Sequence, residues 1–239
     1  MVCRACVDLN KASAEASIKA VSEEISSKLS GSQWANFAPD FRAYECDVTD
    51  ESTVVSTWAD IVNDFGKVDC LVTAAGIVDN VAAEDYGYDR WKKMIDINLH
   101  GSFLFAKQAG SHMLKEKIRG SIIFMSSMSA FICVRPQKQA AYNASKGAVS
   151  MMMKSLATEW GPHGIRVNSL APGYMKTDLI RELLQKDGRG LEEQWAKDVP
   201  LGRMGTPHEL RGTIVYMASD ASSYLNGSDV IVDGGYTAW

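Results

Sequence analysis

The chain has 239 residues, of which 46% are hydrophobic and 23% charged, enough for a substantial core in one large α/β domain or two small ones. A formal net charge of -4, with the cationic side chains scattered, excludes the basic footprint of a nucleic-acid or anionic-membrane binder. The five cysteines form no even disulfide framework, no secretory segment is apparent, and no apolar run approaches the ~20 residues that span a bilayer. We therefore expect a cytoplasmic protein whose partners are small molecules or other protein chains.

The first two predicted elements are a strand and a helix. Residues 2–9 are typical of a strand, and residues 10–29 have helical propensity and mixed charge as far as Gly31. Cys3 and Cys6 form a CxxC, but alternation along a strand places them on opposite faces, and no second CxxC or nearby histidine accompanies them. We predict no metal site and assign these thiols no function.

The next elements repeat the alternation. Residues 41–48 are strand-like, and Asp50 is a favourable N-cap for a helix over residues 51–65, which Gly66 would end. Residues 68–76 form a short apolar run closed by a glycine, which indicates a strand buried on both faces.

A long helix is then predicted from about Tyr88 to Lys117, followed by a strand at 120–127, the helix that contains Tyr142, and a strand at 164–173. Residues 174–199 interrupt this alternation of strands and helices with a polar segment of helical character. Because long insertions in compact domains are often lids, we predict a substrate lid here, within one domain that spans residues 1–239.

The last helix and strand complete the pattern. Thr206 would cap a helix over residues 206–219, with Pro207 at its first position and Glu209 closing a capping box. A strand follows at residues 228–235. Because six strands alternate with helices, we predict an α/β fold with a single doubly wound, Rossmann-like sheet of parallel strands.

The helix that contains Tyr142 carries Lys146 one turn later, and an apolar stripe continues the same face through Val149, Met153, Leu156 and Trp160. An ammonium near a phenol favours the phenolate, so we expect the pKa of Tyr142 to fall by ~1–3 units from ~10, into range for proton transfer at neutral pH. The alternative is a chance pair whose lysine extends to water.

Further motifs accompany the pair in a fixed order. They are TAAG at 73–76, INLHG at 97–101, Ser126-Ser127 at a strand end, YNASK at 142–146, RVNSLAPGYMKT at 166–177 and DGG at 233–235. With these motifs the chain resembles the short-chain dehydrogenase/reductase family from residue 1 to its C-terminus. The resemblance is strongest to the sugar and polyol branch, such as gluconate, arabinitol, mannitol or sorbose oxidoreductases.

The resemblance implies a catalytic set of four residues: Asn98, Ser127, Tyr142 and Lys146. Tyr142 would exchange a proton with the substrate oxygen while Lys146 holds the nicotinamide ribose and lowers the pKa of the tyrosine. Ser127 would hydrogen-bond the same oxygen, and Asn98 would anchor a water that links Lys146 to solvent.

The choice of serine stays open at this point. Ser126 and Ser129 are neighbours of Ser127, and fifteen residues separate Ser127 from Tyr142. The ordinary role of such serines is capping or hydrogen bonding at a strand end.

The resemblance also implies contacts with a dinucleotide: Asp8, Asp47, Val48, Ala74, Ala75, Gly76, Pro172, Gly173, Met175 and Thr177, besides Asn98, Tyr142 and Lys146. Residues 47–48 would meet adenine, residues 74–76 would let the backbone approach the adenosine side, and residues 172–177 would clamp the nicotinamide. Thr73 and Ala74 stand where the family has the two asparagines of its Asn-Asn-Ala-Gly motif.

Asp8 bears on the choice between NAD and NADP. It ends the first predicted strand, where an acidic residue accepts hydrogen bonds from the ribose hydroxyls and repels a 2′-phosphate. NAD is therefore favoured over NADP. The alternative is that Asp8 only caps the helix that follows.

The family's glycine-rich turn, Thr-Gly-x3-Gly-x-Gly, has no counterpart here, because no glycine precedes Gly31. On the resemblance, Met1 falls in the family's second strand, and roughly thirty residues, a whole βα unit at the centre of the sheet, are absent.

Three hypotheses follow for the activity. The first is an NAD-dependent alcohol dehydrogenase/ketone reductase acting on a sugar or polyol, whose start is misassigned or clipped. The second is a truncated, catalytically impaired relative that acts as an oligomer partner, and the third keeps the enzyme but makes the substrate an acyl-thioester ketone. We favour the first because every downstream catalytic position is intact. The resemblance further implies a homo-oligomer, a dimer or tetramer.

Overall fold

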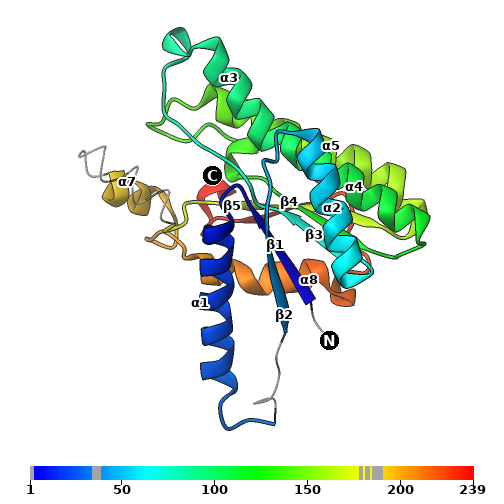
Figure 1. The fold of residues 1–239 in the computed structure, drawn as a ribbon. Coiled ribbons are helices and arrows are strands. Elements are labelled where there is room, and N and C mark those ends of the chain that lie inside the picture. The colour runs from blue at the N-terminus through cyan, green and yellow to red at the C-terminus, as the bar shows by residue number, and fades with distance from the viewer. Residues whose placement is uncertain (1–2, 34–38, 178–179, 181–183, 185–190) are drawn as a thin grey trace. The chain divides into compact units, whose positions relative to one another are not determined.

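The computed structural model describes residues 3–33, 39–177, 180, 184 and 191–239 (Figure 1). The chain divides into two compact units, Met1–Val68 and Asp69–Trp239, and each is described by itself. Of the predicted lid at 174–199, residues 178–179, 181–183 and 185–190 lie outside the described residues.

The first unit contains two parallel strands. β1 (Cys3–Asp8) pairs with β2 (Asp40–Glu45) in a register that sets Cys3 opposite Asp40 and Asp8 opposite Glu45. Because parallel neighbours need a crossover between them, the long helix that separates the two strands in the sequence is the expected connection.

Side-chain caps define the two helices of this unit. α1 (Lys11–Leu29) begins after Asn10, whose side chain accepts a hydrogen bond from the Ala12 amide. α2 (Glu51–Phe65) begins after Asp50, which accepts from two amides of its first turn, and ends at Gly66 with a φ of 78°. That positive φ suits glycine, so both predicted ends of α2 are confirmed.

The second unit contains a four-stranded parallel sheet. Its strands are β3 (Cys70–Thr73), β4 (Ser121–Met125), β5 (Arg166–Pro172) and β6 (Asp229–Val232), in the order β3-β4-β5-β6. The central strands carry the fully buried core of the sheet: Ile122, Ile123, Phe124, Val167, Leu170 and Ala171.

The predicted α/β fold class and its six parallel strands are confirmed. The described strands form two sheets, β1-β2 and β3-β4-β5-β6.

A long helix with one irregular turn leads through the second unit. It consists of α3 (Tyr88–Ile95), a π-helical turn (Asp96–His100) and α4 (Gly101–Lys115), which follow one another beside α5 (Ala140–Trp160) (Figure 1). The helices approach closely at Gly110, where an added Cβ would lie 2.5 Å from the Trp160 ring.

The remaining helices are α7 (Leu191–Asp198) and α8 (Arg211–Ala218). The capping box of Thr206 and Glu209 is confirmed, but the first turn that it caps, Pro207–Leu210, is a 3₁₀ turn rather than α-helix. Other 3₁₀ turns lie at Ala83–Asp85, Met128–Ala130, Gly161–His163, Asp220–Ser222 and Tyr236–Ala238. Within the described parts of the chain, none of the helices has the length and apolar character needed to cross a bilayer.

Candidate active site

Tyr142 and Lys146 lie in the first two turns of α5. The Lys146 Nζ is 5.8 Å from the centroid of the Tyr142 ring. Lys146 is only 6% exposed, and its ammonium donates a hydrogen bond of 2.8 Å to the carbonyl of Met125 at the end of β4. The alternative in which the lysine extends to water is therefore wrong, because the side chain turns inward toward the sheet.

Burial dominates the protonation of this pair. It raises the pKa of the Tyr142 phenol, although a hydrogen bond with the Ser127 side chain lowers it in part. It lowers the pKa of Lys146 to about 8. The expectation that Lys146 lowers the pKa of Tyr142 is wrong for this structure. Desolvation penalises the charged form of both groups, and the ammonium binds a backbone carbonyl rather than the phenol.

The geometry separates the neighbouring serines after β4. The Ser126 hydroxyl lies 2.9 Å from that of Ser150 and donates to the Lys146 carbonyl at 3.4 Å, so it supports the backbone of α5. Ser127 accepts a hydrogen bond of 3.1 Å from the amide of Ser129 and is the serine that reaches Tyr142. Ser127 thus both caps a 3₁₀ turn and stands beside the phenol, while Ser129 contributes an amide.

Asn98 occupies the π-helical turn between α3 and α4 and is fully buried. Its amide binds both backbone groups of Ile77, accepting from the nitrogen at 2.8 Å and donating to the carbonyl at 3.0 Å. It also donates to the Ser145 hydroxyl at 3.0 Å. Asn98 therefore ties the segment after β3 to α5, a role that sequence reasoning missed although a buried amide inside a helical run is a signal for it.

The surroundings of Lys146 fit a ligand that carries hydroxyl groups. An ammonium has three donors, and among the described residues the Lys146 Nζ donates one hydrogen bond. A Cβ added at Gly76 would lie 3.3 Å from the Asn98 Oδ1 and 3.6 Å from the Lys146 Nζ, so glycine keeps the backbone open beside the amine. The Thr73 hydroxyl, 8% exposed as a residue, has no partner in the described part of the chain. A dinucleotide with ribose hydroxyls fits these donors.

The turn after β5 is held by β6 and by the segment before α8. The Gly173 amide donates to the Val232 carbonyl at 3.0 Å. A Cβ at Gly173 would lie 2.7 Å from the Asp233 Cα, an approach that only glycine permits. Met175 bridges to Gly205, and the Thr177 hydroxyl accepts from the Ile180 amide at 3.3 Å. The predicted clamp residues Pro172, Gly173, Met175 and Thr177 thus share one well-supported turn.

A family model described as enoyl-(acyl carrier protein) reductase matches residues 5–237. The sorbose reductase of Schizosaccharomyces pombe is 43% identical over 197 residues, which cover 82% of this chain and 75% of that protein. The chain belongs to the short-chain dehydrogenase/reductase family. It is an NAD(P)-dependent enzyme of the alcohol dehydrogenase/ketone reductase class.

Other members of the family are also similar to this chain. The probable NADP-dependent mannitol dehydrogenase of Yarrowia lipolytica is 42% identical over 197 residues (82% of this chain, 69% of that protein). The NADH-dependent L-xylulose reductase of Ambrosiozyma monospora is 38% identical over 204 residues (84% and 75%). The crystal structure of a short-chain type dehydrogenase/reductase from Mycobacterium marinum matches 98% of this chain and 85% of its own, with a TM-score of 0.87 and 36% identity.

Three of the cofactor positions expected from the family lie in the first unit and are described only within it. The Asp8 carboxylate accepts from the Asn10 amide at 2.9 Å, and that of Asp47 accepts from the amide and hydroxyl of Thr49 at 2.9 and 2.7 Å. The alternative that Asp8 caps the following helix is wrong, because Asn10 is the cap of α1. The roles of Asp8, Asp47 and Val48 toward a cofactor stay predictions.

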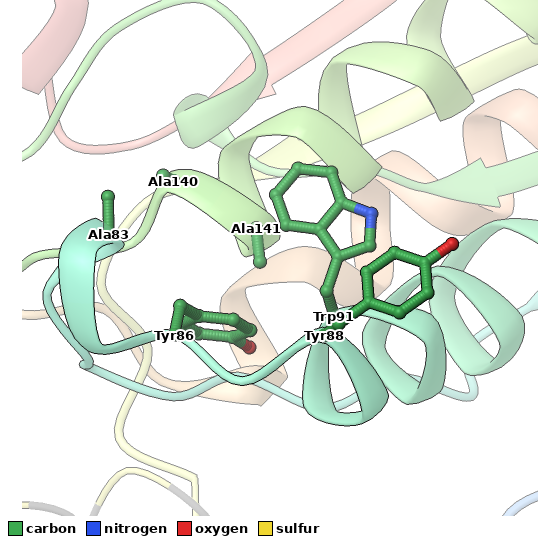
Figure 2. A pocket seen from close by; sticks show the side chains of 6 residues that line it. All are labelled: Ala83, Tyr86, Tyr88, Trp91, Ala140 and Ala141. Carbon is green, nitrogen blue, oxygen red and sulfur yellow. The ribbon is translucent and has the colours of Figure 1, made fainter.

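A hollow of about 170 Å³ lies beside the start of α5 (Figure 2). Its lining residues are Ala83, Tyr86, Tyr88, Trp91, Ala140 and Ala141, none of which was predicted as a site residue. Tyr86 donates to the Asp79 carboxylate at 2.9 Å, and its ring meets Trp91 edge to face. The hollow is lined mainly by apolar and aromatic groups and contains none of the side chains expected to do chemistry.

Gly173→Ala will lower the free energy of unfolding by roughly 1–3 kcal/mol, because the new methyl group meets the backbone of Asp233 rather than a flexible side chain. Urea unfolding of the two proteins measures the difference. Gly212→Ala on α8 is the matched control, since nothing lies within 4 Å of its added Cβ, and alanine favours the helix. An unchanged urea midpoint for Gly173→Ala would show that the turn after β5 accommodates a side chain, which contradicts the prediction.

Proposed function

We propose that this protein interconverts a secondary alcohol and a ketone on a sugar or polyol, with Tyr142 as the acid/base and NAD as the preferred cofactor. The observation that carries the proposal is the placement of Ser127, Tyr142 and Lys146 together where β4 meets α5. The relatives named for sorbose, mannitol and L-xylulose support the substrate class.

Each residue of the proposed site has its own role in the reaction. The Ser127 and Tyr142 hydroxyls bind the substrate oxygen, and Tyr142 gives it a proton during reduction and takes the proton back during oxidation. Because burial raises its pKa, Tyr142 is protonated at neutral pH, which favours the acid role and hence ketone reduction. Lys146 and Asn98 orient the cofactor side, and a bound nicotinamide supplies or accepts the hydride.

The test is a panel of substrates with purified protein. We expect NADH oxidation with ketoses such as L-sorbose and D-fructose, and slower NAD reduction with the corresponding polyols at neutral pH. A rate only with an acyl-thioester ketone would change the substrate class. If circular dichroism shows a folded protein that turns over no member of the panel, the proposal is wrong, and the catalytically impaired relative is the hypothesis that remains.

Asp8→Ser will shift cofactor preference toward NADP by roughly tenfold or more in the ratio of kcat/KM values, because a carboxylate repels the 2′-phosphate and a hydroxyl does not. Parallel NADH and NADPH kinetics measure the ratio. Glu15→Gln removes the same charge from an exposed position on α1 and will leave the ratio unchanged. Equal shifts of this ratio in both variants would mean that net charge alone causes the effect, and would contradict the role of Asp8.

The expectations of a cytoplasmic location, a lid at 174–199, a single domain and a homo-oligomer belong to the same proposal. Exposed apolar side chains on α4 and α5, such as Phe103, Leu114 and Met151, support association between copies of the chain. Light scattering after size-exclusion chromatography distinguishes a dimer or tetramer from a monomer.

A further inference from the structure

A buried apolar cluster joins three segments around the proposed site. Its members are Met128, Val134, Tyr174, Leu191, Trp195, Val199 and Met204. Met128 directly follows Ser127, Tyr174 directly follows Gly173, and Trp195 belongs to α7. The cluster therefore connects α7 with two residues that directly follow predicted contacts: Met128 after the substrate contact Ser127, and Tyr174 after the cofactor contact Gly173.

Two aromatic rings form the centre of this cluster. Tyr174 stacks on Trp195 with ring centroids 4.3 Å apart and planes 6° from parallel, and Tyr236 meets Tyr174 edge to face at 5.5 Å. Trp195 is 1% exposed and Tyr174 9%. The indole N–H and the phenol O–H are thus removed from bulk water, and each needs a partner inside the protein.

A single side chain reaches both groups. With its amide oxygen toward the rings, Gln137 accepts hydrogen bonds from the Trp195 Nε1 at 2.8 Å and from the Tyr174 hydroxyl at 2.9 Å. Its amide nitrogen then donates to the Arg135 carbonyl at 2.9 Å. One amide thereby fixes two rings from different segments to the connection that leads into α5. Neither the Tyr-x3-Lys pattern nor helical periodicity indicates such a residue.

We propose that Gln137 is a positioning residue for the substrate. It acts through Tyr174 and Trp195, holding α7 and the turn after β5 against the connection between Ser127 and Tyr142. Gln137 lies five residues before Tyr142, and its partner Tyr174 adjoins Gly173 of the predicted nicotinamide clamp. Loss of the hydrogen bonds at Gln137 therefore moves the surface that a polyhydroxy substrate contacts more than it alters proton transfer. This inference rests on the proposed function.

Gln137→Met keeps the length of the side chain but offers no acceptor to the two rings. We expect the KM for a ketose to rise roughly tenfold, with kcat within about twofold and NADH affinity unchanged. Gln194→Met is the matched control, because Gln194 precedes Trp195 on the exposed side of α7. It will leave all three quantities unchanged.

Tyr174→Phe provides a second, milder variant that removes one hydrogen bond and keeps the stacked ring. It will raise KM by less than Gln137→Met does, and in the Gln137→Met background it will cause no further rise, since its hydroxyl there has already lost the hydrogen bond to Gln137. Independent, multiplied effects of the two substitutions would contradict an action through Tyr174.

Hydrogen exchange of the α7 amides tests the clamp without any substrate. In Gln137→Met these amides will exchange faster than in the unmodified protein, and in Gln194→Met at the same rate. If the unmodified protein turns over no sugar or polyol, the proposed function fails while the exchange result still decides the clamp. Unchanged α7 exchange, or an equal loss in kcat, substrate KM and NADH affinity that follows a fall in thermal stability, would overturn the positioning role.

Discussion

Tyr142→Phe will lower kcat for ketose reduction by roughly 10²–10⁴-fold, the range that a positioned general acid contributes, and will leave NADH binding nearly unchanged. The hydroxyl is the only part of the side chain that the substitution removes, and the ring keeps its place in the first turn of α5. Steady-state rates and an NADH fluorescence titration measure the two quantities on the same preparations.

The matched control for this prediction is Tyr216→Phe, which removes a hydroxyl from an exposed ring on α8. It will change neither turnover nor NADH affinity. If Tyr142→Phe abolished NADH binding together with turnover, the tyrosine would have a structural role. If it kept most of the activity, another group would have to supply the proton.

The pH profile follows from the burial of Tyr142. Since burial raises the pKa of its phenol, the acid form persists through neutral pH, and ketone reduction will be nearly constant there. Polyol oxidation, which needs the deprotonated form, will increase toward alkaline pH. Sequence reasoning alone gave the opposite sign for this pKa, because the chain pattern shows the neighbouring charge but not the desolvation of both groups.

Local rules predicted the elements well. The two ends of α2 follow from Asp50 and Gly66, and the capping box at Thr206 was visible in four residues of sequence. These features depend on contacts within one turn, so their energetics are local. The π-helical turn at Asn98 was not predicted, and the side chain that it presents hydrogen-bonds Ile77 and Ser145, which are distant in the chain.

The site was predicted as a set of residues but not as an arrangement. The motif order named Ser127, Tyr142 and Lys146, which lie together in the structure, but it did not predict that Ser126 supports the backbone of α5. The hydrogen bonds that Gln137 accepts from Tyr174 and Trp195 were not predicted, for a similar reason. The three residues come from segments whose proximity only tertiary packing creates.

Lys146→Met will lower activity and remove a pH dependence of the unfolding free energy. We expect kcat/KM to fall by roughly 10²-fold or more, because the buried ammonium beside Gly76 and Asn98 is lost from the cofactor side. NADH affinity will fall with it, in contrast to Tyr142→Phe. Full activity in this variant would remove Lys146 from the proposed chemistry.

The stability effect follows from the pKa of Lys146, which burial lowers to about 8 in the folded protein, against the ordinary 10.5 of a lysine in water. Between these pH values the unfolded chain binds more protons than the folded one, so the unfolding free energy of the unmodified protein rises with pH from about 8 to about 10.5. The shift corresponds to roughly 3 kcal/mol. Urea unfolding across this range will show the rise in the unmodified protein and not in Lys146→Met, whereas parallel curves would mean that Lys146 is not desolvated. A charge whose burial costs stability, at a position where methionine would pack without that cost, is what a site for chemistry requires and a core does not.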